Sequence, residues 1–179
     1  MNVVLIYKII KLYGWNKRGQ PLSTRKSAKS INFTVIGAIS MNGMIGYLIL
    51  QGGSVSQVFV GFFCYLINQL SQIQNGKHLK DYVFIIDNAR SHLKFFLQYM
   101  RPGINIVWTP PYTPQLNPIE IIWSQWKKLV YRRESWKNQD ELIFAIASAS
   151  KSLNPGCFLK AYTHTLRFYE RCLNKEDIN

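Results

Sequence analysis

The chain has 179 residues, which suits one ordinary domain, and 47% of them are hydrophobic and 14% aromatic. This composition supplies enough apolar side chain for a real core and excludes an intrinsically disordered chain. The formal net charge of +13 makes nucleic acid the first expected partner, because a strongly positive surface gathers phosphates. The alternative is a basic protein that merely tolerates its charge.

The first half of the chain predicts three strands followed by a buried helix. The strand segments are rich in Val, Ile, Phe and Tyr, and Asn42-Gly43 joins two of them, since Asn-Gly is the strongest short hairpin signal. Apolar residues at helical spacing then follow a glycine pair. The expected elements are strands at 3–13, 31–40 and 44–50 and a helix at 55–73.

The second half alternates helices and strands. Tyr82 to Ile86 is a continuous apolar run of strand length, typical of a strand covered on both faces. The segment from Pro110 to Pro118 contains four prolines, so we expect it to be stiff and extended rather than helical. The expected elements are a strand at 82–86, a helix at 89–99, a strand at 104–107, a helix from 118, and helices at 140–150 and 157–173.

The helix after the proline-rich segment has a clear predicted start. Asn117 suits the N-cap, Pro118 suits the first helical position, and Glu120 falls at the third position of a capping box. The residues of its apolar face are Ile119, Ile122, Trp123, Trp126 and Val130.

The order of these elements predicts an α/β fold of the RNase H-like kind: a mixed five-stranded sheet flanked by helices, with extra helices at the C-terminus. We expect a single domain over residues 1–179. Its core spans about residues 13–150, and residues 151–179 form a C-terminal helix.

Two acids stand out at the junctions of these elements. Asp87 follows a buried strand directly, and open α/β sheets bind ligands at the carboxyl ends of their strands. Glu120 lies on the first turn of a helix. Each acid alone has a structural explanation, helix capping. Together they suggest a site for hard divalent cations, which take oxygen ligands from carboxylates and phosphates, and we expect them to converge on one accessible cleft.

Two strings carry a family resemblance: Asp87 to His92 (DNARSH) and Pro110 to Glu120 (PPYTPQLNPIE), with Trp123 one turn further on. They resemble the core of transposases of the Tc1/mariner and IS630 type, and the likeness runs from Tyr13 to the helix near Ala147. The resemblance implies a DDE endonuclease with a two-metal site for Mg²⁺ or Mn²⁺, which cuts transposon ends and joins them to target DNA in transposition and DNA integration.

The same resemblance implies roles for particular residues. Asp87 and Glu120 are the implied catalytic metal ligands, and Asn88 and His92 border the site. The basic residues after Glu120 are candidate contacts for DNA phosphates, with an ordinary solvated helix face as the alternative. These residues are Lys127, Lys128, Arg132 and Arg133.

The sequence departs from the family pattern in its first part. Residues 1–80 contain no Asp or Glu, whereas the family carries a first Asp that by its spacing falls at or just before Met1. An N-terminal helix-turn-helix region is also absent. We therefore interpret the chain as an N-terminally truncated catalytic domain, with impaired cleavage. One alternative is a catalytically inactive DNA-binding relic, and another is a scaffold that meets other copies through its terminal helices as a homo-oligomer.

The remaining expectations concern the compartment. Cys64, Cys157 and Cys172 show no CxxC spacing, so the sequence predicts neither a disulfide framework nor a cysteine zinc site. The longest apolar stretch, Val58 to Ile67, is short for a bilayer span, and no secretory cleavage pattern follows Met1. We expect a protein that is not secreted and binds no membrane, nuclear in a eukaryote and in the cytoplasm or nucleoid of a bacterium.

Overall fold

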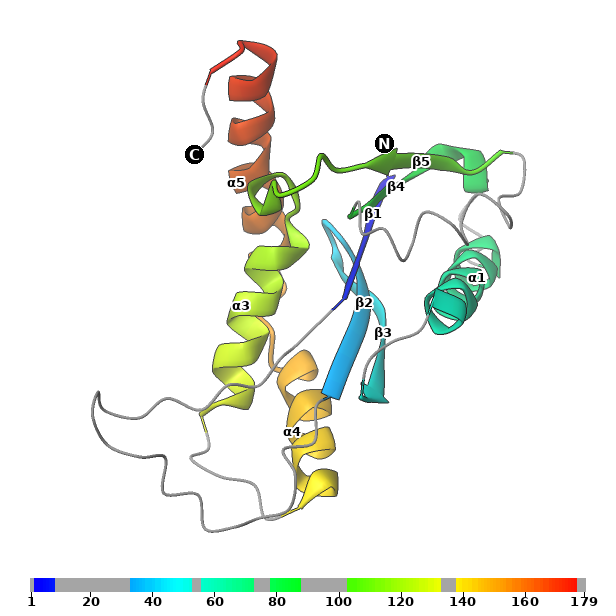
Figure 1. The fold of residues 1–179 in the computed structure, drawn as a ribbon, viewed down its shortest axis with the longest axis vertical. Helices are drawn as coiled ribbons and strands as arrows, with labels where there is room; N and C mark the ends of the chain where they lie inside the picture. Colours follow the sequence, from blue (N-terminus) through cyan, green and yellow to red (C-terminus); the bar gives the residue numbers. More distant parts are fainter. Residues whose placement is uncertain are drawn as a thin grey trace.

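The computed structural model describes the backbone of residues 2–8 and all of residues 33–52, 56–72, 78–87, 103–132 and 138–176. Its centre is a five-stranded sheet in the order β3-β2-β1-β4-β5 (Figure 1). The strands are β1 (Asn2–Lys8), β2 (Phe33–Ser40), β3 (Gly43–Gln51), β4 (Tyr82–Ile86) and β5 (Asn105–Trp108). With helices on both faces of this sheet, the predicted α/β fold is confirmed.

The sheet is mixed. β1, β4 and β5 run parallel, while β2 is antiparallel to both β1 and β3. Parallel neighbours end at the same edge of a sheet, so the carboxyl ends of β1, β4 and β5 gather there. The central strand β1 belongs to the expected segment 3–13, of which residues 9–13 lie outside the described residues.

The hairpin forms where Asn-Gly predicts it. Gly43 has a positive φ of 146°, a conformation that favours glycine. The N–H of Asn42 also donates to the Ser40 hydroxyl at 3.2 Å. The turn therefore fixes which residues of β2 and β3 face each other, and with them the two faces of the sheet.

The helices divide between the two faces. Helix α1 (Ser56–Gln72) covers one face, and the group α3 (Ile119–Val130), α4 (Gln139–Lys151) and α5 (Gly156–Leu173) lies on the other side, as Figure 1 shows. Two separate apolar clusters result, one under α1 and one under α3 and α4. A sheet buried on both faces needs the near-continuous apolar strands that the sequence contains.

Helix α3 packs tightly on the sheet through two tryptophans. Trp123 and Trp126 are fully buried and stacked, with ring centroids 5.0 Å apart. The Nε1 of Trp126 donates to the carbonyl of Ile146 at 2.9 Å, which ties α3 to α4. Gly37 on β2 provides the room, because a Cβ there would stand only 2.8 Å from Cη2 of Trp123. The predicted apolar face of α3 is thus the packed one.

The proline-rich segment differs from the prediction. It holds a 3-10 turn, η2 (Pro114–Leu116), so the expectation of an extended, non-helical loop is wrong for these residues. The amide of Leu116 donates to Thr113 and that of Asn117 to Pro114, at 3.1 and 3.0 Å. Proline suits the first position of such a turn, since its φ is already near the required value.

Helix α3 starts one residue later than predicted and without the predicted cap. Its N-cap is Pro118 and its first residue is Ile119, whereas the sequence predicted Asn117 and Pro118 at these positions. The Asn117 side chain is buried, and neither its oxygen nor its nitrogen has a hydrogen-bond partner. The predicted capping box is therefore wrong, because its N-cap side chain accepts no bond from Glu120.

Two further observations complete the fold. The expected helix at 89–99 lies outside the described residues. No single described helix is long and apolar enough to cross a membrane; α4 and α5 pass such a test only as a pair, bent by 77°.

Candidate metal site

Asp87 is held at the carboxyl end of β4. The amide of Thr109, the first residue after β5, donates to the carbonyl of Ile86 at 2.9 Å, so the two chain ends remain joined beyond the sheet. Along β4 the side chain of Ile86 belongs to the cluster under α1, and that of Ile85 packs on the cluster under α3. Because strand side chains alternate, continuing the strand by one residue turns partly buried Asp87 toward the α3 side.

Glu120 lies on the first turn of α3. It sits beside the buried stripe of this helix and is itself partly buried. A carboxylate in the first turn of a helix lies near the positive end of the helix dipole. The start of α3 thus holds Glu120 at the edge of the packed face of this helix.

The strand register relates the two acids. Gly37 of β2 pairs with Tyr7 of β1, and Ile6 of β1 pairs with Ile86 of β4. Continuing the pairing of β1 with β4 by one residue makes Tyr7 and Asp87 neighbours. Gly37, Tyr7 and Asp87 then form one row across the sheet, with about 4.8 Å between strands. Trp123 lies over Gly37, and Glu120 precedes it by one turn. Both acids therefore lie on the α3 side near this row; that their carboxylates converge on one cleft stays a prediction.

The first carboxylate of a three-acid site has no counterpart in β1. The strand reads NVVLIYK and contains no acid. Family spacing placed the first Asp at or before Met1, whereas the register places Tyr7 beside Asp87. Among the residues that the structure describes, no group of three or more His, Cys, Asp or Glu side chains could hold a metal ion.

The loop between the two acids is fastened by α5, which the sequence did not indicate. The hydroxyl of Tyr169 donates to the carbonyl of Leu116 at 2.9 Å, across 53 residues of chain. Burial, and secondarily the nearby Cys172, raise the pKa of Tyr169, so it keeps its proton. This contact fixes the turn directly before Glu120, and no local motif in the sequence predicts it.

The predicted basic contacts stay a prediction. Lys127 follows Glu120 by two helical turns and shares its side of α3, whereas exposed Lys128 lies about a quarter of a turn round the helix from that side. Arg132 lines a hollow at the far end of α3. Arg133 lies outside the described residues, as do the two predicted border residues, Asn88 and His92.

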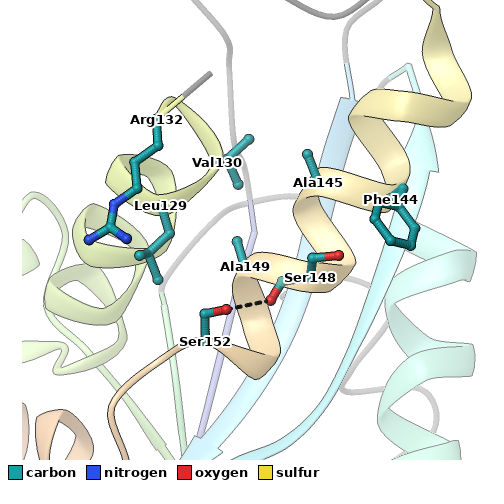
Figure 2. Close-up of a pocket in the computed structure, with 8 residues that line it drawn as sticks. All are labelled: Leu129, Val130, Arg132, Phe144, Ala145, Ser148, Ala149 and Ser152. Carbon is teal, nitrogen blue, oxygen red and sulfur yellow. Dashed lines mark hydrogen bonds between the residues drawn. The ribbon is translucent and has the colours of Figure 1, made fainter. Parts of the chain in front are cut away.

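The hollow of about 310 Å³ lies between the end of α3 and α4 (Figure 2). Leu129 on its wall follows Glu120 by nine residues, so about 14 Å of helix separate the hollow from the acid. None of the described residues that line it is acidic. The lining residues are Leu129, Val130, Arg132, Phe144, Ala145, Ser148, Ala149 and Ser152. It is therefore separate from the candidate metal site.

The strand order, with acids after β4 and at the start of α3, defines an RNase H-like domain. Comparison with known families identifies it further: residues 8–143 match the family described as DDE superfamily endonuclease. The match covers most of the chain, which therefore belongs to this family. Comparison with curated protein sequences found no match.

Solved structures share the fold. The crystal structure of the Mos1 mariner paired end complex with Mn aligns with a TM-score of 0.73 at 13% identity, over 97% of this chain and 55% of that one. The structure of the Mos1 transposase catalytic domain and raltegravir with Mg aligns with a TM-score of 0.70 at 11% identity. The alignment covers 97% of this chain and 82% of that one. This chain thus spans about half the length of the Mos1 chain in the paired end complex. At this identity the likeness shows the fold, as the resemblance to mariner-type transposases predicted.

Proposed function

We propose that the chain is the catalytic core of a DDE transposase, whose inherited chemistry is metal-dependent cleavage and strand transfer of DNA. One observation supports the proposal: Asp87 follows β4 and Glu120 opens the helix α3, which packs on the face of the sheet toward which the alternation of β4 turns Asp87. The family to which the chain belongs is described as DDE superfamily endonuclease, and cleavage by a two-metal site needs acids that share the metal ions.

The donor set fits a hard cation. Two carboxylates, completed by water and substrate phosphates, suit Mg²⁺ or Mn²⁺. We propose Asp87 and Glu120 as the ligands, with Asn88 and His92 at the border of the site. Bound metal would supply an activated water and neutralise the charge that develops on the phosphate. The chain's own part is to hold one acid at a strand end and the other at the start of a packed helix, and to fix the proline-rich loop between them.

We further propose that cleavage by this chain is impaired. A two-metal site needs a ligand that bridges both ions, and β1 offers no acid to share Asp87's row. The alternative is a catalytically inactive DNA-binding protein, which the acid-free β1 favours.

The partners and the setting are also proposals. Relatives of the same fold have been solved as a paired-end complex with the left transposon end and as a strand transfer complex. We propose DNA as the partner here too, bound through phosphates with little sequence preference by a single domain of charge +13. Lys127, Lys128, Arg132 and Arg133 are proposed contacts. We also propose that the protein forms a homo-oligomer. We expect it in the nucleus of a eukaryote or in the cytoplasm or nucleoid of a bacterium.

Restoring the missing acid tests the enzyme proposal. In Tyr7→Asp a carboxylate enters the row of Asp87, so we expect the variant to nick supercoiled plasmid with Mg²⁺ or Mn²⁺, while the unaltered chain nicks little. Tyr7→Asn is the matched control, since it has the same size without the charge. Adding Asp87→Ala or Glu120→Ala should abolish the gained activity.

Two outcomes would contradict this reasoning. Strong metal-dependent nicking by the unaltered chain, lost in Asp87→Ala, would show that two acids suffice. A folded, DNA-bound Tyr7→Asp variant that nicks no better than Tyr7→Asn would favour the inactive DNA-binding alternative.

A further inference from the structure

Tyr112 is presented to solvent in an unusual way. Its side chain is 100% exposed, whereas the other large hydrophobic residues among those the structure describes keep part of their surface covered. Its φ is +60°, in the left-handed region that L side chains rarely adopt. A residue with an unfavourable backbone conformation and no buried surface does little to stabilise the fold. Such conformational outliers gather at functional sites.

Hydrogen bonds fasten the loop backbone that carries this ring. The Thr113 hydroxyl donates to the carbonyl of Pro110 at 2.7 Å and closes the turn around Tyr112. Two longer-range bonds anchor the loop on either side, from the Thr109 amide to Ile86 and from the Tyr169 hydroxyl to Leu116. The backbone beneath the exposed ring therefore needs little further ordering when a ligand contacts it.

The loop also places the ring beside the candidate metal site. It begins at Thr109, next to Asp87, and ends in the turn that leads to Glu120. No acid occurs from Gly103 to Ile119, so the loop itself does not repel phosphate. The two residues before the tyrosine, Pro110 and Pro111, are also exposed and leave its ring prominent.

We propose that Tyr112 is a stacking platform for an unpaired DNA base next to the phosphate that cations at Asp87 and Glu120 would bind. The proposal rests on the proposed function, because the metal site supplies the reason for DNA to lie there. Every base presents a flat face, so one rigid exposed ring binds single strands without selecting a sequence. A protein partner would instead require a broad apolar patch, and the neighbours of Tyr112 are proline and threonine.

The test compares ring-removing and ring-keeping variants. The probes are a single-stranded oligonucleotide with 2-aminopurine near its 3′ end and a blunt duplex, both titrated at low salt with Ca²⁺, a hard cation that takes the same oxygen ligands. Tyr112→Asn removes the ring but tolerates the left-handed backbone, so its thermal midpoint should not fall below that of the unaltered chain. Tyr112→Phe keeps the ring. Tyr65→Ala is the matched control, since Tyr65 is an exposed tyrosine on α1, across the sheet.

Loss of stacking should weaken single-strand binding by Tyr112→Asn about 5- to 150-fold and remove the quenching of 2-aminopurine. Binding of the blunt duplex should change much less. Tyr112→Phe and Tyr65→Ala should match the unaltered chain within about twofold, a margin well below the loss of one stacked base.

The outcomes separate this inference from the proposed function. If the unaltered chain binds neither probe at low salt, the proposed function fails and the inference with it. If it binds both probes but Tyr112→Asn binds and quenches equally well, the stacking proposal alone is overturned. An equal loss on single strand and duplex would also overturn it, because a base platform must distinguish them.

Discussion

Replacing Gly37 by alanine measures how closely α3 packs on the sheet. The added Cβ would stand 2.8 Å from Cη2 and 3.2 Å from Cζ2 of Trp123, against about 3.5–4.0 Å for an ordinary carbon contact. Trp123 is buried and stacked on Trp126, so it cannot rotate away. Overpacking of this kind costs about 1–3 kcal/mol, which exceeds the gain from a less flexible unfolded chain, roughly 0.5–1 kcal/mol.

The net cost is therefore up to about 2.5 kcal/mol. Thermal unfolding followed by circular dichroism should show the midpoint of Gly37→Ala lowered by up to roughly 10 °C, since 1 kcal/mol corresponds to about 2–4 °C at this size. Two glycines serve as controls. At Gly46 the nearest atom to an added Cβ is 3.6 Å away, and at Gly61 nothing lies within 4 Å. Gly46→Ala should change little, and Gly61→Ala on α1 should stabilise by about 0.5–1 kcal/mol. A Gly37→Ala midpoint equal to that of the unaltered chain would refute the packing of Trp123 on β2.

Two other substitutions concern α5. Tyr169→Phe should cost about 0.5–1.5 kcal/mol in urea unfolding, because it removes the hydrogen bond to Leu116; an unchanged midpoint would mean that α5 does not fasten the loop. Burial first, then Tyr169, raise the pKa of Tyr162. The stability that comes from keeping the Tyr162 hydroxyl protonated is therefore present below about pH 10 and lost as pH rises further. Tyr162→Phe has no such hydroxyl and should lose less stability at alkaline pH. Exposed Cys64 and Cys172 should react quickly with a thiol reagent, whereas Cys157 is buried with its pKa raised and should react only on unfolding; fast labelling of all three would contradict this packing.

The elements that the sequence predicted well are those with a strong local signal. Tyr82 to Ile86 is the strand β4 at the predicted bounds, because a short apolar run between polar residues has few other solutions. The Asn42-Gly43 hairpin and the buried stripe of α3 also follow from local chemistry. Each depends on neighbours within one turn or one strand.

The features that the sequence missed depend on contacts far along the chain. The parallel pairing of β1 with β4, which places Tyr7 beside Asp87, joins residues about eighty positions apart. The bond from Tyr169 to Leu116 and the buried, unpartnered side chain of Asn117 are likewise set by α5 and the core. Proline content alone predicted an extended loop, whereas the hydrogen bonds of η2 turn it. Local propensity is a weak guide where tertiary contacts decide the conformation.

Convergence of the two acids can be measured separately from catalysis. Two carboxylates that share a small site repel each other until a cation joins them, so a ligand that binds only the folded chain must stabilise it. At ten times its dissociation constant, Mg²⁺ or Mn²⁺ should add about 1.4 kcal/mol, a rise of roughly 3–6 °C in the unfolding midpoint. Asp87→Ala and Glu120→Ala should each remove the rise, whereas Asp140→Ala, at an exposed acid of α4, should keep it. If the midpoint rises equally in all three variants, the metal binds elsewhere. Asp87 and Glu120 would then serve only the fold, one at the end of a strand and the other at the start of a helix.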